Sequence, residues 1–245
     1  MDFKTAALGG IAGAVLGVAA VYGLSGAGLL PGRTGDAAIH AYLMKHPQIL
    51  VDMTNELQAQ QQQADDDARQ AAVNKLGTKA YFDPRVAFVT GPANAKTTFV
   101  EFFDYNCPFC RSSNAVVEKF YQAHKNDVRF AFIEFPIKGQ ASIDATRISL
   151  AARQQPDKYL ALHFALMNQN GQTDAATVVQ EAKKLGFNLT KLQADEEADA
   201  VSAEIAAAHT LAGASGIDGT PAFIINGKVR EGAIDDHVLE QMLKG

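Results

Sequence analysis

The chain contains only two cysteines, Cys107 and Cys110, and they lie between a predicted strand and a predicted helix. Residues 97–103 are rich in β-branched and aromatic side chains, which is typical of a buried strand. Residues 112–124 carry apolar side chains at spacings of three and four, which predicts a helix with one apolar face. This position at a strand-to-helix junction indicates a redox centre in a mixed α/β chain.

The start of that helix suits a reactive thiolate. The first backbone N–H groups of a helix lack partners and its dipole favours a negative charge, so the pKa of the Cys107 thiol should be lowered. Pro108 fits the first turn because its missing N–H would be unpaired there. Cys110 lies one turn further on, after Phe109, and is placed to resolve a mixed disulfide formed at Cys107.

Three other interpretations of the cysteine pair compete with redox chemistry. A structural disulfide is poorly supported, because so short a loop removes little entropy from the unfolded chain. A zinc site needs about two more ligands, and the sequence has no second Cys-x-x-Cys motif. A copper(I) site remains open, because two thiolates suit a soft ion.

Two segments of the chain resemble a known family. Residues 100–111, VEFFDYNCPFCR, resemble the active-site segment of the DsbA-family thioredoxin-fold proteins, nearest the ScsC-like branch with an N-terminal oligomerisation arm. Residues 219–223, GTPAF, resemble the thioredoxin-fold loop whose proline is cis and packs beside the cysteines. The resemblance covers residues 81–245 well and the preceding arm loosely. It implies an α/β thioredoxin fold with an inserted helical domain.

The resemblance also implies roles for residues outside the cysteine motif. Glu101 matches the buried acid that assists proton transfer at the resolving cysteine. The residues alone leave a solvent-facing position open for it, since side chains alternate along a strand. Thr220 and Pro221 match the loop that pairs with an extended substrate segment. Without the resemblance, an ordinary trans turn is the simpler interpretation of Pro221.

The N-terminal residues 1–32 predict a membrane anchor or a signal peptide. No charged residue lies between Lys4 and Arg33, and this interval is long enough to cross a bilayer. We favour an uncleaved anchor because the apolar core of a signal peptide is usually shorter. Export with cleavage after residues 25–27 is the alternative. Because the cysteine pair must cycle with substrate disulfides, we expect the body to face the periplasm.

Residues 33–80 predict a helical arm with a break at Pro47. Beyond the break, Leu50, Met53 and Leu57 continue an apolar stripe that has no partner within the arm itself. We expect this stripe to join copies of the chain into a dimer or trimer, as the resemblance implies. Periodicity alone is equally compatible with packing of the stripe against the body.

The remainder, residues 81–245, predicts the DsbA-like thioredoxin domain. A strand is expected at 128–135, followed by helices over about 140–211 that are too long for a loop and fit an inserted domain. Asn226-Gly227 then predicts a tight hairpin between two short strands. Residues 235–243 predict a closing helix.

Charge and composition narrow the possible partners. The formal net charge is −5 and there is no basic cluster, which argues against a nucleic-acid partner.

We expect a periplasmic thiol-disulfide oxidoreductase that needs no dissociable cofactor and no resident metal, acting on exported proteins. A DsbB-like membrane partner would reoxidise it as an oxidase, and a DsbD- or ScsB-like partner would keep it reduced as an isomerase or reductase. The alternative function is a periplasmic copper(I)-binding module that uses the same thiolates.

Overall fold

The computed structural model describes residues 34–244, which fall into two units divided between Gln63 and Ala64. The predicted anchor, residues 1–32, lies outside the described residues. Within the described range, no helix is both long and apolar enough to span a bilayer.

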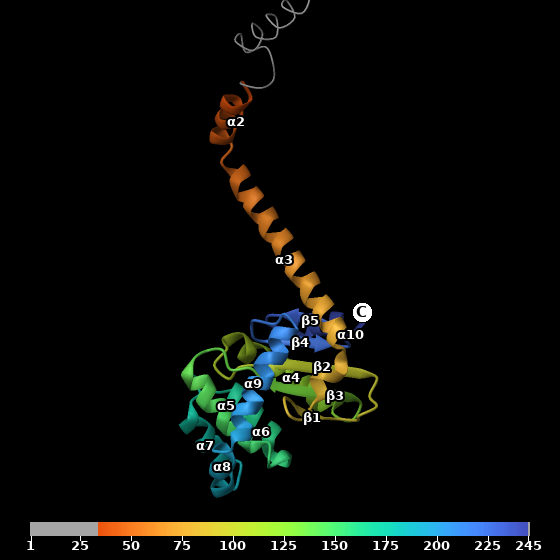
Figure 1. Cartoon of the computed structure of the whole chain (residues 1–245), viewed down its shortest axis with the longest axis vertical. Helices are drawn as coiled ribbons and strands as arrows, with labels where there is room; N and C mark the ends of the chain where they lie inside the picture. The colour runs from red at the N-terminus through yellow and green to blue at the C-terminus, as the bar shows by residue number, and fades with distance from the viewer. Residues whose placement is uncertain (1–33, 245) are drawn as a thin grey trace, which may run out of the picture. The chain divides into compact units, whose positions relative to one another are not determined.

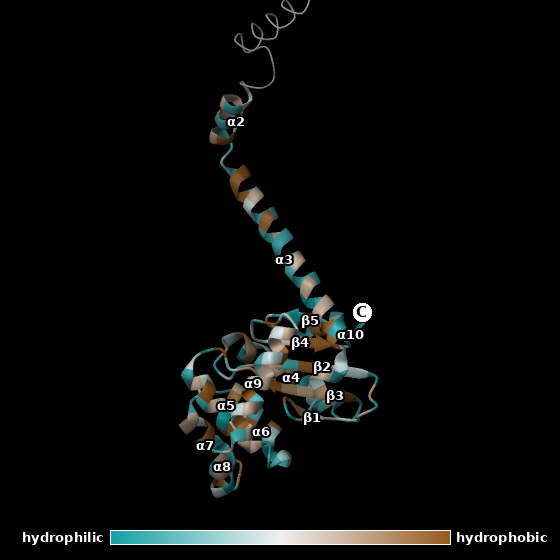
Figure 2. Ribbon diagram, in the orientation of Figure 1, coloured by the Kyte–Doolittle hydropathy of each residue, from teal (hydrophilic) through white to brown (hydrophobic). Residues whose placement is uncertain are grey.

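The predicted arm is helical on both sides of Pro47. Helix α2 spans Thr34–Lys45 and helix α3 spans Gln48–Leu76, and the last part of α3 belongs to the second unit. Within residues 35–63, the large apolar side chains are exposed apart from the half-buried Ile49, and they include Leu50 at 72%, Met53 at 63% and Leu57 at 55%. Figure 2 shows brown, apolar positions in α2 and in the first turns of α3. Self-association through this stripe stays a prediction.

The second unit is built on a five-stranded sheet with the order β1-β3-β2-β4-β5 (Figure 1). Its strands are β1 (Phe88–Thr90), β2 (Thr97–Phe103), β3 (Val128–Glu134), β4 (Ala222–Ile225) and β5 (Lys228–Glu231). Strands β2 and β3 are parallel, and the other neighbouring pairs are antiparallel. The parallel pair requires a crossover, which helix α4 (Pro108–His124) supplies.

Strand alternation gives the sheet two apolar faces. On one face, Phe99, Phe103, Phe130 and Phe132 pack into a core with residues of α4 and of the closing helix α10 (Asp236–Lys244). On the other face, Val100, Phe102 and Ile133 pack with the end of α3, the 3-10 helix η1 (Thr78–Phe82) and α9 (Asp199–Ala214). The sheet is therefore covered on both sides, which is the layered arrangement of the thioredoxin fold.

The predicted helical insertion is confirmed between β3 and β4. It consists of α5 (Gln140–Ala152), α6 (Pro156–Met167), α7 (Ala175–Lys184), α8 (Leu189–Glu196) and α9. Figure 1 shows α5, α6, α7 and α8 grouped together, and α5 packs against each of the other three. The insertion contributes Ile148, Leu162 and Leu166 to the same core as the cysteines.

The hairpin signal is confirmed, and one short strand was missed by the sequence analysis. Asn226 and Gly227 both have positive φ, at 52° and 83°, as a two-residue turn of this kind needs. Strand β1 has only three residues and is followed by Gly91, which also has positive φ. A Cβ atom there would lie 2.0 Å from the Val128 carbonyl oxygen, so this close approach requires glycine.

Candidate functional site

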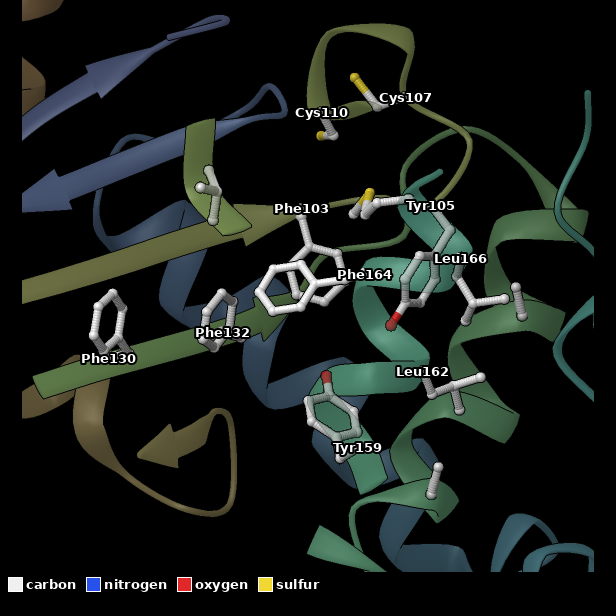
Figure 3. Packing of buried hydrophobic residues seen from close by; sticks show 14 of the residues in the cluster. Phe103, Tyr105, Cys107, Cys110, Phe130, Phe132, Tyr159, Leu162, Phe164 and Leu166 are labelled. Atoms are coloured by element: carbon white, nitrogen blue, oxygen red, sulfur yellow. The ribbon is translucent and has the colours of Figure 1, made fainter. Parts of the chain in front are cut away.

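The two cysteines lie at the N-terminus of α4, as predicted. Cys107 is the N-cap residue, with φ −81° and ψ 118°, and Pro108 occupies the first turn. Both cysteines are buried free thiols, whereas Phe109 between them is 61% exposed. Figure 3 shows their side chains beside the aromatic core that includes Phe103 and Tyr105. The motif therefore combines two protected sulfur atoms with one exposed apolar side chain.

The fold brings the second predicted motif against the first. The Thr220-Pro221 peptide bond is cis, as the resemblance implied. The Cys107 sulfur lies 3.0 Å from the Thr220 carbonyl oxygen, across 113 positions of sequence, and the thiol in its protonated form donates a hydrogen bond to that oxygen. Strand β4 begins at Ala222, directly after Pro221, so the loop leads straight into the sheet. The loop and the cysteine pair thus form one site.

The two thiols have opposite acidities. The pKa of Cys107 is lowered to about 5, first by a hydrogen bond with the Cys110 side chain and further by the Thr220 side chain and the backbone of Cys110 and Phe109, against the effect of burial. The pKa of Cys110 is raised, because its thiol is desolvated and lies beside Cys107. At neutral pH, Cys107 is therefore a thiolate and Cys110 a protonated thiol, which is the division of roles that stepwise exchange requires.

Glu101 lies on the cysteine side of the sheet rather than in solvent. It is 2% exposed, and strand alternation places it on the same face as Phe99 and Phe103. Its register neighbours are Phe132 and Phe223, and its Oε2 atom has no hydrogen-bond partner among the described residues. Burial raises the pKa of this carboxyl to about 8. Its charge raises the pKa of Cys110 in turn, so the two groups are electrostatically coupled.

Asp104 shapes the turn that carries the cysteines. Its carboxylate accepts hydrogen bonds from the backbone N–H groups of Asn106, Ile137 and Lys138, at 2.7–2.9 Å, and from the Ser142 hydroxyl at 2.7 Å. This buried carboxylate therefore joins the active-site turn to the segment between β3 and α5.

Asn106 and Arg111 hold a loop of the helical insertion beside the cysteines. Asn106 accepts a hydrogen bond from the Thr173 N–H at 2.7 Å and donates one to the Thr173 carbonyl at 2.8 Å. Arg111 donates to the Tyr105 carbonyl, the Gly171 carbonyl and the Thr173 hydroxyl. Sequence analysis did not identify these contacts, because Thr173 has no motif around it.

A third buried carboxylate, Glu134, lies at the end of β3 and was also missed by the sequence analysis. The hydroxyl groups of Tyr159 and Ser149 donate to its Oε1 at 2.9 and 3.0 Å, and Arg153 Nη2 lies 3.6 Å away. Burial raises the pKa of Glu134 to about 7, although Arg153 and the two hydroxyl groups oppose the shift. Arg153 also pairs with Glu204 at 3.3 Å. These contacts fasten the insertion to the sheet.

Comparison with known proteins matches two parts of the chain. Residues 83–245 match the family model described as thioredoxin, and residues 36–64 match the N-terminal domain of the copper resistance protein ScsC. The structure of a thioredoxin-like oxidoreductase from Silicibacter pomeroyi is 38% identical, covering 69% of this chain and 96% of its own, with a TM-score of 0.63. The catalytic domain of Proteus mirabilis ScsC is 29% identical, covering 71% and 96%, with a TM-score of 0.63.

The curated relatives extend this pattern. The thiol:disulfide interchange protein DsbA of Bordetella parapertussis is 26% identical over 135 residues, which are 54% of this chain and 65% of that protein. Na(+)/H(+) antiporters NhaA also match, and the chain spans only about a quarter of their length: 26% identity over 162 residues covers 26% of the Herminiimonas arsenicoxydans protein. With its thioredoxin-family match and its ScsC-type N-terminal segment, the chain belongs to the thioredoxin family, in the ScsC-like branch of the DsbA-type proteins.

Proposed function

We propose that this protein is a thiol-disulfide oxidoreductase that exchanges disulfides with exported proteins. The observation that carries the proposal is the contact between Cys107 and the Thr220-Pro221 loop, at a cysteine whose pKa is lowered to about 5. A thiolate is the attacking species in disulfide exchange, and the adjacent loop offers a backbone edge to an extended substrate. We assign substrate binding to Thr220 and Pro221, and also to Phe109, whose apolar side chain is exposed between the two cysteines.

In the reducing direction the exchange takes two steps. The Cys107 thiolate attacks one sulfur of a substrate disulfide, forms a mixed disulfide and releases the other substrate sulfur as a thiolate. Cys110 then loses its proton and attacks the Cys107 sulfur, which releases the second substrate thiolate. The substrate gains two electrons and two protons, and the Cys107–Cys110 disulfide forms. Substrate oxidation is the same sequence in reverse.

Glu101 is the group we propose to handle the Cys110 proton. A buried carboxyl whose pKa is about 8 is mostly protonated at neutral pH, but it exchanges its proton readily near that pH. Its electrostatic coupling to Cys110 supports this role. In the second step Glu101, when ionised, accepts the Cys110 proton, and in the reverse direction it returns the proton.

The cellular compartment and the redox partner are proposed from the same thiol-disulfide chemistry. A pair that cycles with substrate disulfides belongs in an oxidising compartment, so we place the body in the periplasm, tethered by residues 1–32 or released by cleavage. The low pKa of Cys107 stabilises the dithiol form and so makes the disulfide form a better oxidant. A DsbB-like partner would regenerate this oxidising disulfide, so that the protein oxidises its substrates. A DsbD- or ScsB-like partner would keep the pair reduced for isomerisation or reduction.

We propose that the exposed stripe of α2 and α3 joins copies of the chain into a dimer or trimer. The match of residues 36–64 to the ScsC N-terminal domain and the exposure of Leu50, Met53 and Leu57 support this proposal. An oligomer would bring several cysteine pairs to one substrate, which suits disulfide isomerisation. Sedimentation of the full chain and of a Leu50→Glu, Met53→Glu variant would test the assembly.

The test of the activity uses a peptide disulfide and the purified reduced protein. We expect rapid exchange, complete loss in Cys107→Ser, and a trapped mixed disulfide in Cys110→Ser, because the resolving step is then missing. The Ser112→Ala variant serves as a control, since its exposed hydroxyl bonds only to the Phe109 carbonyl. Exchange that persists at the wild-type rate in Cys107→Ser would refute the proposal.

The second candidate function is copper(I) binding by the same two thiolates. The family name of the N-terminal match, copper resistance, favours testing it. No group of three or more metal-ligating side chains occurs among residues 34–244, so the dithiol is the site to titrate. Stoichiometric copper(I) uptake that requires both cysteines, in a protein inactive on disulfides, would favour this function over exchange.

A further inference from the structure

Glu231, the last residue of β5, holds the segment that leads into the Thr220-Pro221 loop. Its Oε1 atom accepts hydrogen bonds from the backbone N–H groups of Asp218, at 3.0 Å, and Gly219, at 3.4 Å. Just beyond it, the Gly232 N–H donates to the Pro221 carbonyl at 2.8 Å. The carboxylate therefore fixes the backbone immediately before Thr220, whose own carbonyl meets Cys107.

Arg69, in the last part of α3, contacts both this carboxylate and the same segment. Its Nη2 lies 3.0 Å from Glu231 Oε2, its Nε donates to the Gly216 carbonyl at 3.1 Å, and its Nη1 lies 2.7 Å from Asp66. Only 9% of the Arg69 side chain and 21% of the Glu231 side chain are exposed. Such shielding makes an ion pair less sensitive to salt than a surface pair.

The neighbouring residue, Gln70, makes the approach of the helix specific. Its amide accepts from the Val229 N–H at 3.0 Å and donates to the Gly227 carbonyl at 2.8 Å, so it pairs with the outer edge of β5. A Cβ atom on Gly216 would lie 3.5 Å from the Arg69 Cα, which shows that the two backbones lie close together. The end of α3 is thus joined to both the hairpin and the base of the loop.

We infer that Arg69 and Glu231 are positioning residues for the substrate loop: they hold residues 216–219 so that Thr220 stays in register with Cys107. This inference rests on the proposed function for its consequence in catalysis. A loop ordered before binding lowers the entropy cost of docking a substrate segment, so it improves affinity more than the chemical step. The end of the helical arm thereby becomes a structural part of the thiol site.

The variants Glu231→Ala, Glu231→Gln and Arg69→Lys separate the contacts. Alanine removes both the ion pair and the acceptor for Asp218 and Gly219, whereas glutamine keeps an acceptor oxygen but loses the charge. Lysine at 69 keeps the charge but cannot contact Gly216 and Glu231 together in the fork geometry of arginine. The matched control is Glu181→Gln, which breaks the Glu181–Lys184 pair in α7, where the Glu181 side chain is 10% exposed.

Three measurements on the full chain test the inference. We expect amide hydrogen exchange in residues 216–220 to become about tenfold faster in Glu231→Ala, as expected for a lost hydrogen bond to a charged group. KM for a peptide disulfide should rise about five- to tenfold while kcat changes by less than about twofold. The pKa of Cys107, followed by thiolate absorbance, should rise because the Thr220 side chain is among the groups that lower it. Glu231→Gln and Arg69→Lys should show smaller changes in the same direction.

The outcomes are distinguishable. Unchanged exchange of residues 216–220 in Glu231→Ala, or an equal change in Glu181→Gln, would overturn the positioning role. A fall in kcat accompanied by a fall in the urea midpoint of unfolding, with KM unchanged, would also overturn it, because this combination indicates general destabilisation. If the wild-type protein fails to exchange disulfides, the proposed function fails, while hydrogen exchange and the thiolate titration still decide whether Arg69 and Glu231 hold the loop.

Discussion

Two buried carboxylates on the same face of the sheet, Glu101 and Glu134, have opposite surroundings. The Oε1 atom of Glu134 is contacted by Tyr159, Ser149 and Arg153, whereas Glu101 faces aromatic neighbours. The Oε2 atoms of both carboxyls lack a hydrogen-bond partner among the described residues, so the two sites differ in what surrounds the other oxygen. Burial raises the pKa of Glu134 to about 7 and the pKa of Glu101 to about 8. The difference teaches that burial alone does not define a functional acid. Glu134, with its three partners, holds the insertion, whereas Glu101 is the carboxyl that we propose exchanges a proton with Cys110.

The largest expected effect is the loss of stability in Glu134→Ala. Removing this carboxylate leaves the Arg153 guanidinium buried without its partner on β3, which costs about 4 kcal/mol in the free energy of unfolding. Urea unfolding at pH 7 would measure it. A loss below about 1 kcal/mol would show that Glu204 alone satisfies Arg153 and would weaken the contrast with Glu101.

The next effect is a pH-dependent gain of stability in Glu101→Gln. The folded-state pKa of about 8 lies above the ordinary value of 4.5, so the stability due to the protonated carboxyl is fully present below pH 4.5 and is lost as pH rises through 8. Relative to the variant, the wild type should lose about 2 kcal/mol between pH 5 and pH 7. The oxidised protein should be used, since it has no thiol to titrate. Parallel stability curves would contradict the raised pKa.

The third effect separates the two acids in catalysis. Glu101→Gln should slow the resolution of the mixed disulfide about tenfold at pH 7, because Cys110 loses its proton acceptor. Glu134→Gln, which keeps a hydrogen-bond acceptor for Tyr159 and Ser149, should change that rate by less than about twofold. Stopped-flow measurement of single-turnover exchange would show it. Equal slowing in both variants would remove the functional distinction.

The smallest expected effect is on the Cys107 titration. Neither acid is among the groups that lower the pKa of Cys107, so the thiolate absorbance should keep its midpoint near pH 5 in both glutamine variants. Because this pKa is below the ordinary thiol value of 9.0, the thiolate stabilises the reduced form above pH 9 and the gain is lost as pH falls through 5. A midpoint that moves by more than about one pH unit in either variant would show that the replaced acid helps to set the pKa of Cys107.

Sequence analysis predicted the elements around the site well. The strand at 97–103 matches β2 (Thr97–Phe103), and the Asn226-Gly227 turn lies where the hairpin was expected. Their local patterns are strong, because strand alternation and turn chemistry depend on neighbouring residues. The three-residue β1 was missed, because a segment so short carries too little periodicity and pairs only through β3.

The sequence by itself determined the cysteine motif at a helix N-terminus and, by resemblance, the loop opposite it. These features reside in short, contiguous segments whose chemistry is local. Only the tertiary structure decided which distant groups complete the site: Thr173 bound to Asn106 and Arg111, Glu134 with Arg153, and Glu231 with Arg69. Such partners come from separate elements, and their contacts depend on how the sheet, the insertion and the end of α3 pack, which no local pattern specifies.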